Sequence, residues 1–155
     1  MSGDEIPSVP EIVRALLRAD PGVQEAAPGG VMVGPASYEE QQAGCVSLNE
    51  EGLGERTEPG LPLIRHRMAC RCLATSDFTA AAIGRAVFAC LHQKGRRVVE
   101  QPSTGKSYLV HWSEVRGGPT GLAADEEGAL VPGIQENKLV VEALVGTQEV
   151  VAAGS

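Results

Sequence analysis

The chain has 155 residues, of which 43% are hydrophobic and 21% charged, and its formal net charge is −7. This length fits a single domain over residues 1–155, with a core large enough to need no disulfide or metal support. The negative charge disfavours general binding to nucleic acid or to anionic membranes through bulk electrostatics. With no apolar run of 18 residues and an acidic N-terminus, we expect no membrane span and no signal peptide.

The N-terminal residues predict a flexible tail and then one helix. Residues 1–7 are polar, and we expect them to be flexible. Ser8 and Glu11 have the spacing of a capping box, with Pro10 in the first turn. The apolar residues that follow are three and four apart, which is typical of an amphipathic helix: Val9, Ile12, Val13, Leu16 and Leu17. The residues at 20–22, Asp-Pro-Gly, are expected to end it.

A glycine- and proline-rich stretch comes next. It predicts short strands at residues 31–33 and 44–49, each flanked by turn residues. Residues 50–60 are acidic, contain three glycines and show no periodicity, so we expect an exposed loop there. That loop carries Glu50, Glu51 and Glu55.

Residues 61–95 are the centre of the chain, because a strand pattern passes directly into a helix pattern. The first half alternates, which is typical of a strand with one buried face. One side of this strand carries His66, Met68, Cys70 and Cys72, and the other carries Arg65, Arg67 and Arg71. From residue 78 the apolar spacing becomes helical: Phe78, Ala82, Ile83, Ala86, Val87, Cys90 and Leu91. Thr75 or Ser76 is expected to cap this helix, with Gly95 as the left-handed residue after it.

The last third of the chain predicts further strands. We expect them at residues 96–100, 106–115 and 138–145, followed by a flexible tail over 146–155. Residues 117–133 form a long glycine-rich segment, which we expect to be an extended loop or arm. Loops of that length are usually functional or become ordered on a partner. The element order predicts an α+β fold: one largely antiparallel sheet packed against two helices, with long Gly/Pro-rich loops.

Sequence motifs for catalysis are weak. Residues 105–107 read Gly-Lys-Ser, but the glycine that a phosphate-binding loop needs five residues earlier is Glu100, and a strand follows instead of a helix. A hairpin turn is therefore favoured. Cys70 and Cys72 have only one residue between them, and a second cysteine pair is missing, so buried thiols are favoured over zinc. We expect no cofactor and no catalytic site.

The row Arg65, Arg67 and Arg71 has two interpretations. A solvated face is the default, and a contact with another subunit or with nucleic acid is the alternative. Complementary contacts between copies are physically reasonable because acidic residues occur elsewhere in the chain. These candidate contact residues are Glu50, Glu51, Glu55, Asp125, Glu126 and Glu127.

The layout resembles the tail terminator (tail completion) proteins of long-tailed bacteriophages. The resemblance lies in the helix at 10–19, the strand residues 65–74 and the alanine-rich helix at 78–94, and it covers most of residues 8–145. In the family's pattern, a strand written x-Arg-x-x-Val-x-Cys-x-Ala runs into a helix rich in alanine, and a last pair of strands follows.

The resemblance implies a small α+β protomer that forms a homohexameric ring at the tail–neck junction of a virion, after assembly in the host cytoplasm. Such a ring ends polymerisation of the tail tube protein and presents a docking surface to a head-completion or connector protein. Genome DNA passes through its lumen without specific binding, which an acidic chain suits.

Three alternatives remain at this point. The first is a head–tail connector (neck) protein of similar size. The second is a small cytosolic enzyme that uses Cys70, Cys72 or His66. The third is a binding module that pairs through an exposed strand edge.

Overall fold

The computed structural model describes residues 6–57, 60–121 and 132–151. In these residues six strands form one sheet in the order β1-β2-β3-β6-β5-β4. The strands are β1 (Val31–Val33), β2 (Cys45–Thr57), β3 (Leu63–Ala74), β4 (Arg97–Gln101), β5 (Lys106–Gly121) and β6 (Gln135–Glu149). The described pairs are antiparallel except for β1 with β2. The predicted α+β class with a largely antiparallel sheet is confirmed.

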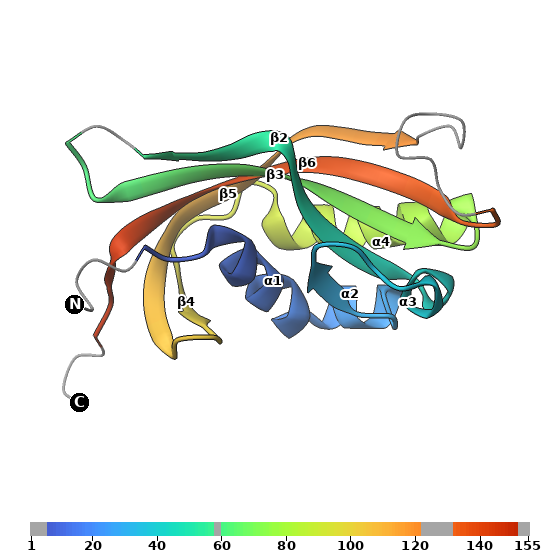
Figure 1. Ribbon diagram of the computed structural model, residues 1–155, viewed down its shortest axis with the longest axis horizontal. Coiled ribbons are helices and arrows are strands. Elements are labelled where there is room, and N and C mark those ends of the chain that lie inside the picture. Colours follow the sequence, from blue (N-terminus) through green and yellow to red (C-terminus); the bar gives the residue numbers. More distant parts are fainter. Residues whose placement is uncertain (1–5, 58–59, 122–131, 152–155) are drawn as a thin grey trace.

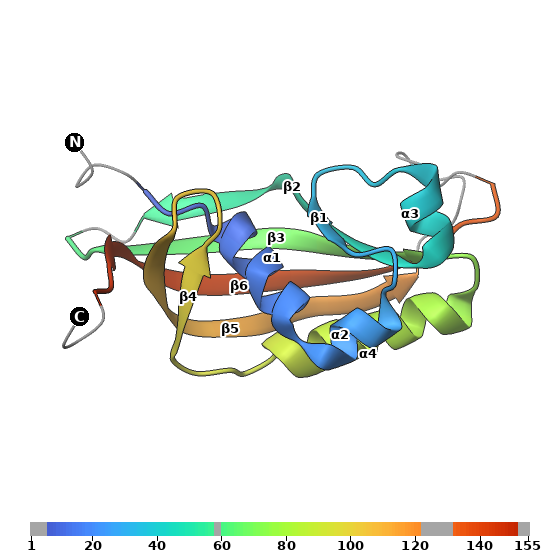
Figure 2. The ribbon, with the colours of Figure 1, turned by 90° about the horizontal axis from the view of Figure 1, so that it is seen from below.

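The sheet curves into a half-barrel, and helices lie on its concave face (Figure 1). Four helices are described: α1 (Val9–Ala19), α2 (Pro21–Ala26), α3 (Tyr38–Ala43) and α4 (Asp77–Leu91). The view from below shows α1, α2 and α4 in front of the sheet, with α3 at the margin beside β1 and β2 (Figure 2). The two longer helices match the two that the sequence predicts.

The two short helices were not expected. Asp20, read in the sequence as part of a helix stop, caps α2: its side chain accepts hydrogen bonds from the backbone N–H groups of Gly22 (2.8 Å) and Val23 (3.2 Å). Ser37 and Glu40 form a complete capping box at the start of α3. Both caps satisfy amide groups that a helix start leaves without partners. Helices this short have too little periodicity to be recognised in a sequence.

Three strands are longer than expected. Residues 50–57 belong to β2, so the exposed loop predicted over 50–60 is wrong for them. A register shift between Asn49 and Gly54 absorbs the irregular sequence, while pairing with β3 supplies the backbone hydrogen bonds. Residues 117–121 belong to β5, and residues 146–149 belong to β6. Pro7 is buried, so the end of the predicted N-terminal tail is packed.

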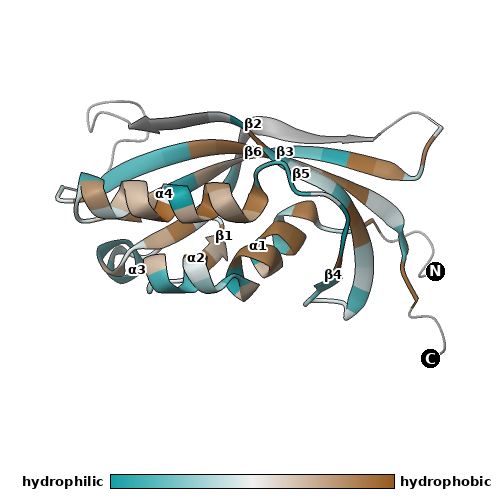
Figure 3. Ribbon diagram, turned by 180° about the vertical axis from the view of Figure 1, so that it is seen from behind, coloured by the Kyte–Doolittle hydropathy of each residue, from teal (hydrophilic) through white to brown (hydrophobic). Residues whose placement is uncertain are grey.

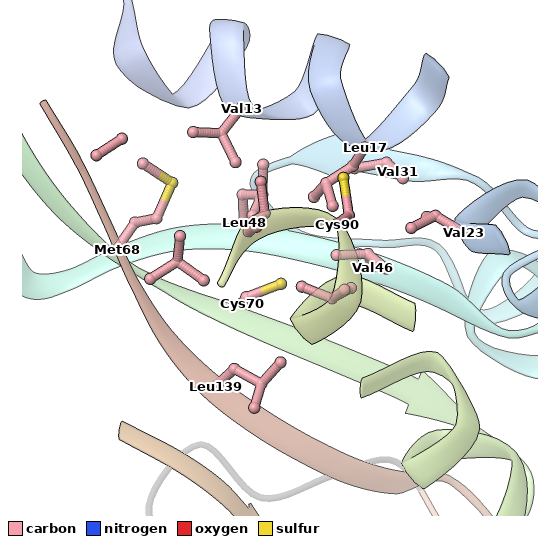
Figure 4. Packing of buried hydrophobic residues seen from close by; sticks show 14 of the residues in the cluster. Val13, Leu17, Val23, Val31, Val46, Leu48, Met68, Cys70, Cys90 and Leu139 are labelled. Atoms are coloured by element: carbon pink, nitrogen blue, oxygen red, sulfur yellow. The ribbon is translucent and has the colours of Figure 1, made fainter. Parts of the chain in front are cut away.

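The core lies between the concave face of the sheet and the helices. The predicted alternation of β3 is confirmed, since His66, Met68, Cys70 and Cys72 are all buried. Figure 4 shows Met68 and Cys70 packed with residues of α1 and neighbouring strands, including Leu17 and Leu48. Each fully buried apolar side chain of this size contributes about 1.5–3 kcal/mol. A register slip of one residue in β3 would turn its arginines into this core.

The start of α1 departs from the expected capping box. The Ser8 side chain makes no capping hydrogen bond within the described residues. Glu11 instead accepts hydrogen bonds from the Ser103 backbone N–H (2.7 Å) and hydroxyl (2.8 Å). Ser103 lies in the turn between β4 and β5, where Gly105 has φ 73°, so the predicted hairpin turn is confirmed. Glu11 therefore fixes α1 to this hairpin.

The ends of α4 agree in part with the sequence. Ser76 caps it, with its hydroxyl accepting a hydrogen bond from the Thr79 backbone N–H at 3.1 Å. The left-handed residue after the helix is Gln93 (φ 51°), not Gly95. Phe78 is 88% exposed, so its place in the predicted buried stripe is wrong. The side chain of Phe78 points away from the core, whereas Ala80 in the same helical turn is buried.

Candidate functional site

The convex face of the sheet, opposite the helices, carries the arginines that the sequence singles out. Successive side chains of a strand point to opposite faces, so the arginines of β3 share this face with neighbours on β5 and β6. We call this surface the arginine face: Arg65, Arg67, Arg71, Trp112, Glu114, Arg116, Glu136, Lys138 and Glu142. It holds five basic residues and three acidic ones, a local charge of +2 on a chain whose net charge is −7.

Glu142 is the centre of this face. Its side chain is only 5% exposed and lies between two arginines from the neighbouring strands. Arg67 Nη2 is 3.3 Å from Glu142 Oε2, and Arg116 Nε is 2.9 Å from Glu142 Oε1. The arginine side chains are 48% and 42% exposed. The buried Glu142 carboxylate therefore holds two half-exposed arginines in place. Each guanidinium has more N–H donors than its contact with Glu142 uses.

Arg71 makes a second pair with a buried carboxylate. Its Nε is 2.6 Å from Glu136 Oε1, and its Nη2 also contacts that oxygen. The Glu136 side chain is fully buried and that of Arg71 is 25% exposed. Burial of an ion pair costs desolvation, so such a pair fixes geometry more reliably than it adds stability. Arg71 is thus a structural residue of the sheet.

Trp112 is the aromatic member of the arginine face. The guanidinium carbons of Arg65 and Arg116 lie 5.8 Å and 5.5 Å from its ring centroid. Both distances are within the range of cation–π attraction. Register places Trp112 and Arg65 on either side of Leu144, so the indole lies between cations of two strands. The result is a flat surface of planar groups, a type enriched at protein interfaces.

The structure thus brings the predicted arginines together, but with acidic residues that the sequence analysis missed. Glu136 and Glu142 lie in β6, an even number of residues from Lys138, so all three side chains lie on one face of the strand. This alternation was the signal that could have revealed them. Glu50, Glu51 and Glu55 lie in β2, and only their backbone is described; register places Glu55 opposite His66. Asp125, Glu126 and Glu127 lie outside the described residues.

The cysteines do not form a reactive site. All four are buried, and no disulfide joins them in the described part of the chain. Burial, with a smaller effect from the nearby Glu40 carboxylate, raises the pKa of Cys45 to about 11. Burial and a hydrogen bond with Asp20 raise the pKa of Cys90 to about 12. A hydrogen bond with Cys70, together with burial, raises the pKa of Cys72 as well. Neutral thiols at pH 7 are poor nucleophiles and metal ligands, which disfavours a catalytic role for Cys72.

The described residues contain neither a metal-binding cluster nor a membrane-spanning helix. Among residues 6–57, 60–121 and 132–151, no group of three His, Cys, Asp or Glu side chains is placed to hold a metal ion. None of the described helices is long and apolar enough to cross a membrane.

Comparison with known proteins gives a likeness of fold. No protein-family model and no curated protein matches the chain. Among solved structures, a chain of the "Virion of native gene transfer agent (GTA) particle" is similar, with a TM-score of 0.61 and 19% sequence identity. The match covers 90% of this chain and 95% of that chain. At this identity the comparison establishes that the two chains share a fold from end to end.

Proposed function

We propose that this protein is a structural component of a phage-like virion that forms a ring on the end of the tail tube. The ring stops polymerisation of the tube protein and provides the docking surface for a head-completion or connector protein. It is a homohexamer at the tail–neck junction, assembled in the host cytoplasm, and genome DNA passes through its lumen without specific binding.

One observation carries this proposal. The fold is shared over nearly the full length of both chains with a protein of a gene transfer agent virion.

The arginine face is the proposed contact with tube or neck proteins. Arg67 and Arg116 are half exposed, and Glu142 holds both in fixed positions. Because their side chains are already ordered, less conformational entropy is lost when a partner carboxylate binds them. Arg65, Arg71 and Trp112 complete the surface.

Residues 117–133 are the proposed contact arm toward neighbouring subunits. Residues 117–121 extend β5, and residues 122–131 lie outside the described part of the chain. The acidic residues at 50–55 and 125–127 are the proposed counterparts of basic surfaces on neighbouring subunits. Deletion of residues 122–131 should leave a folded protomer that fails to cap tails. Tails of normal length from that variant would refute the role of the arm.

Tail length in a null mutant tests the function. A missing terminator leaves tube growth unchecked, so electron micrographs should show abnormally long tails. Tails of normal length that do not join heads would instead establish the neck protein. Complementation with Arg67→Gln or Arg116→Gln, each of which leaves Glu142 one arginine partner, tests the arginine face, with the exposed Arg96→Gln as the matched control. Circular dichroism verifies that each variant is folded, and we expect only the two arginine-face variants to lose capping.

A further inference from the structure

Helix α4 is apolar on more than the side that faces the sheet. Its inward side is buried through Ala80, Ile83, Gly84, Val87, Cys90 and Leu91. A second stripe, Phe78, Ala81 and Phe88 with the charged Arg85 among them, faces away from the core, with Phe78 88% and Phe88 42% exposed. Figure 3 shows mainly brown to pale colours along α4, with little of the teal that marks hydrophilic residues. A helix that is apolar on most sides is normally covered on most sides.

The second stripe borders a groove against β6. Its walls are Ala81, Gly84, Arg85, Phe88, Asn137 and Leu139, and its volume is about 360 Å³. Gly84 allows the helix to approach β6 this closely, because a Cβ there would lie 2.8 Å from Asn137 Oδ1. Grooves of this size are large enough to bury an aromatic side chain.

The groove has one sign of charge. From Phe78 to His92 the chain contains a single charged residue, the exposed Arg85, and no acidic residue. An isologous contact between two such helices would bring two Arg85 side chains together, and like charges oppose that arrangement. A partner surface that combines exposed apolar groups with a carboxylate would match the groove.

Such a surface lies on the other margin of the same molecule. Tyr38 of α3 is 48% exposed and Val33 at the end of β1 is 47% exposed. Glu39 is exposed beside Tyr38, and α3 carries two glutamates and no basic residue. Figure 2 places α3 beside β1 and β2, with α4 toward the opposite margin beneath β6 and β5. We call Tyr38 and Glu39 the α3 edge.

We propose that the α4 groove of one copy receives the α3 edge of the next copy. Tyr38 enters the apolar groove beside Phe88, and Glu39 pairs with Arg85. Because the two surfaces are different, the contact is heterologous and repeats head to tail. Contacts of this type close into rings when the rotation between copies allows it. The proposal rests on the ring described above and names the surfaces that join its subunits.

A charge-swap experiment tests this interface. We expect Arg85→Glu and Glu39→Arg each to weaken self-association about 10-fold or more, and the double swap to recover it to within about threefold. Arg96→Glu, at an exposed position off the groove, is the matched control and should assemble like the wild type. Particle mass is measured by light scattering, with and without tail tubes, and circular dichroism verifies that each variant is folded.

Each outcome decides the proposal. The interface is overturned if the single variants assemble like the wild type. It is also overturned if the double variant is folded but does not regain self-association. A wild-type protein that stays monomeric both free and on tubes overturns it as well. Tail length is scored in parallel to separate the two proposals. Single swaps that abolish the ring but leave tail length normal would leave the interface standing and remove the terminator function. Single swaps that still form the ring and cap tails normally would remove the interface and leave the terminator function standing.

Discussion

Removal of both arginines around Glu142 should destabilise the protein by more than the sum of the two single changes. Arg67→Met and Arg116→Met keep the apolar part of each side chain and remove its charge. In either single variant the other arginine still pairs with Glu142. Since these arginines are about half exposed, each single change should cost only about 0.5–1 kcal/mol.

The double variant is different because the Glu142 side chain, 5% exposed, would lose both of its arginine partners. Leaving a buried charge without a partner typically costs about 3–5 kcal/mol. The single changes together cost about 1–2 kcal/mol, so the expected coupling energy is about 2 kcal/mol.

Urea denaturation followed by circular dichroism measures these free energies of unfolding. The series is repeated at two protein concentrations, because self-association adds to apparent stability. Arg67→Met combined with Arg96→Met is the control pair, since Arg96 is exposed and distant from Glu142 in sequence and sheet position, and its effects should add. Costs for Arg67 and Arg116 that add to within about 0.5 kcal/mol would refute the shared-carboxylate account.

Three further predictions concern the core and α4. Alkylation of Cys45 and Cys90 at pH 8 should be roughly 100-fold slower in the folded protein than in urea and should accelerate as the pH rises toward 11 and 12; equal rates would contradict the burial of these thiols. Ser76→Ala should lower the free energy of unfolding by about 1 kcal/mol, and an unchanged urea midpoint would show that the cap adds nothing. Ile83→Ala should cost about 2–5 kcal/mol, against less than about 1 kcal/mol for Val98→Ala at a position 58% exposed; similar losses at both sites would argue against the packing described for α4.

The sequence predicted the parts of the fold that have a clear period. The alternation from Arg65 to Cys72 and the helical spacing that follows identified β3 and α4, and with them the α+β class. The lengths of β2, β5 and β6 could not be predicted from their residues. Residues 50–57 contain charges and glycines that disfavour a strand locally, and it is the long neighbour β3 that supplies their pairing. Tertiary context decided the outcome there.

The candidate site, like the fold, was predicted only in part from the sequence. The three arginines share one exposed face, as expected from their parity, but their partners come from a strand about 70 residues later in the chain. No local pattern reveals which carboxylate of β6 will face which arginine until the register of β3 with β6 is known. The α4 groove was also missed, because Phe78 was predicted to be a core residue and Phe88 was not singled out in a helix that is apolar on most sides.

The mass of the purified protein, with and without polymerised tail tube, tests the central claim most directly. We predict a particle near six times 16.2 kDa, free in solution or formed at tube ends, with binding restricted to those ends. A stable monomer that does not bind tubes would contradict the proposal that this chain caps a virion tail.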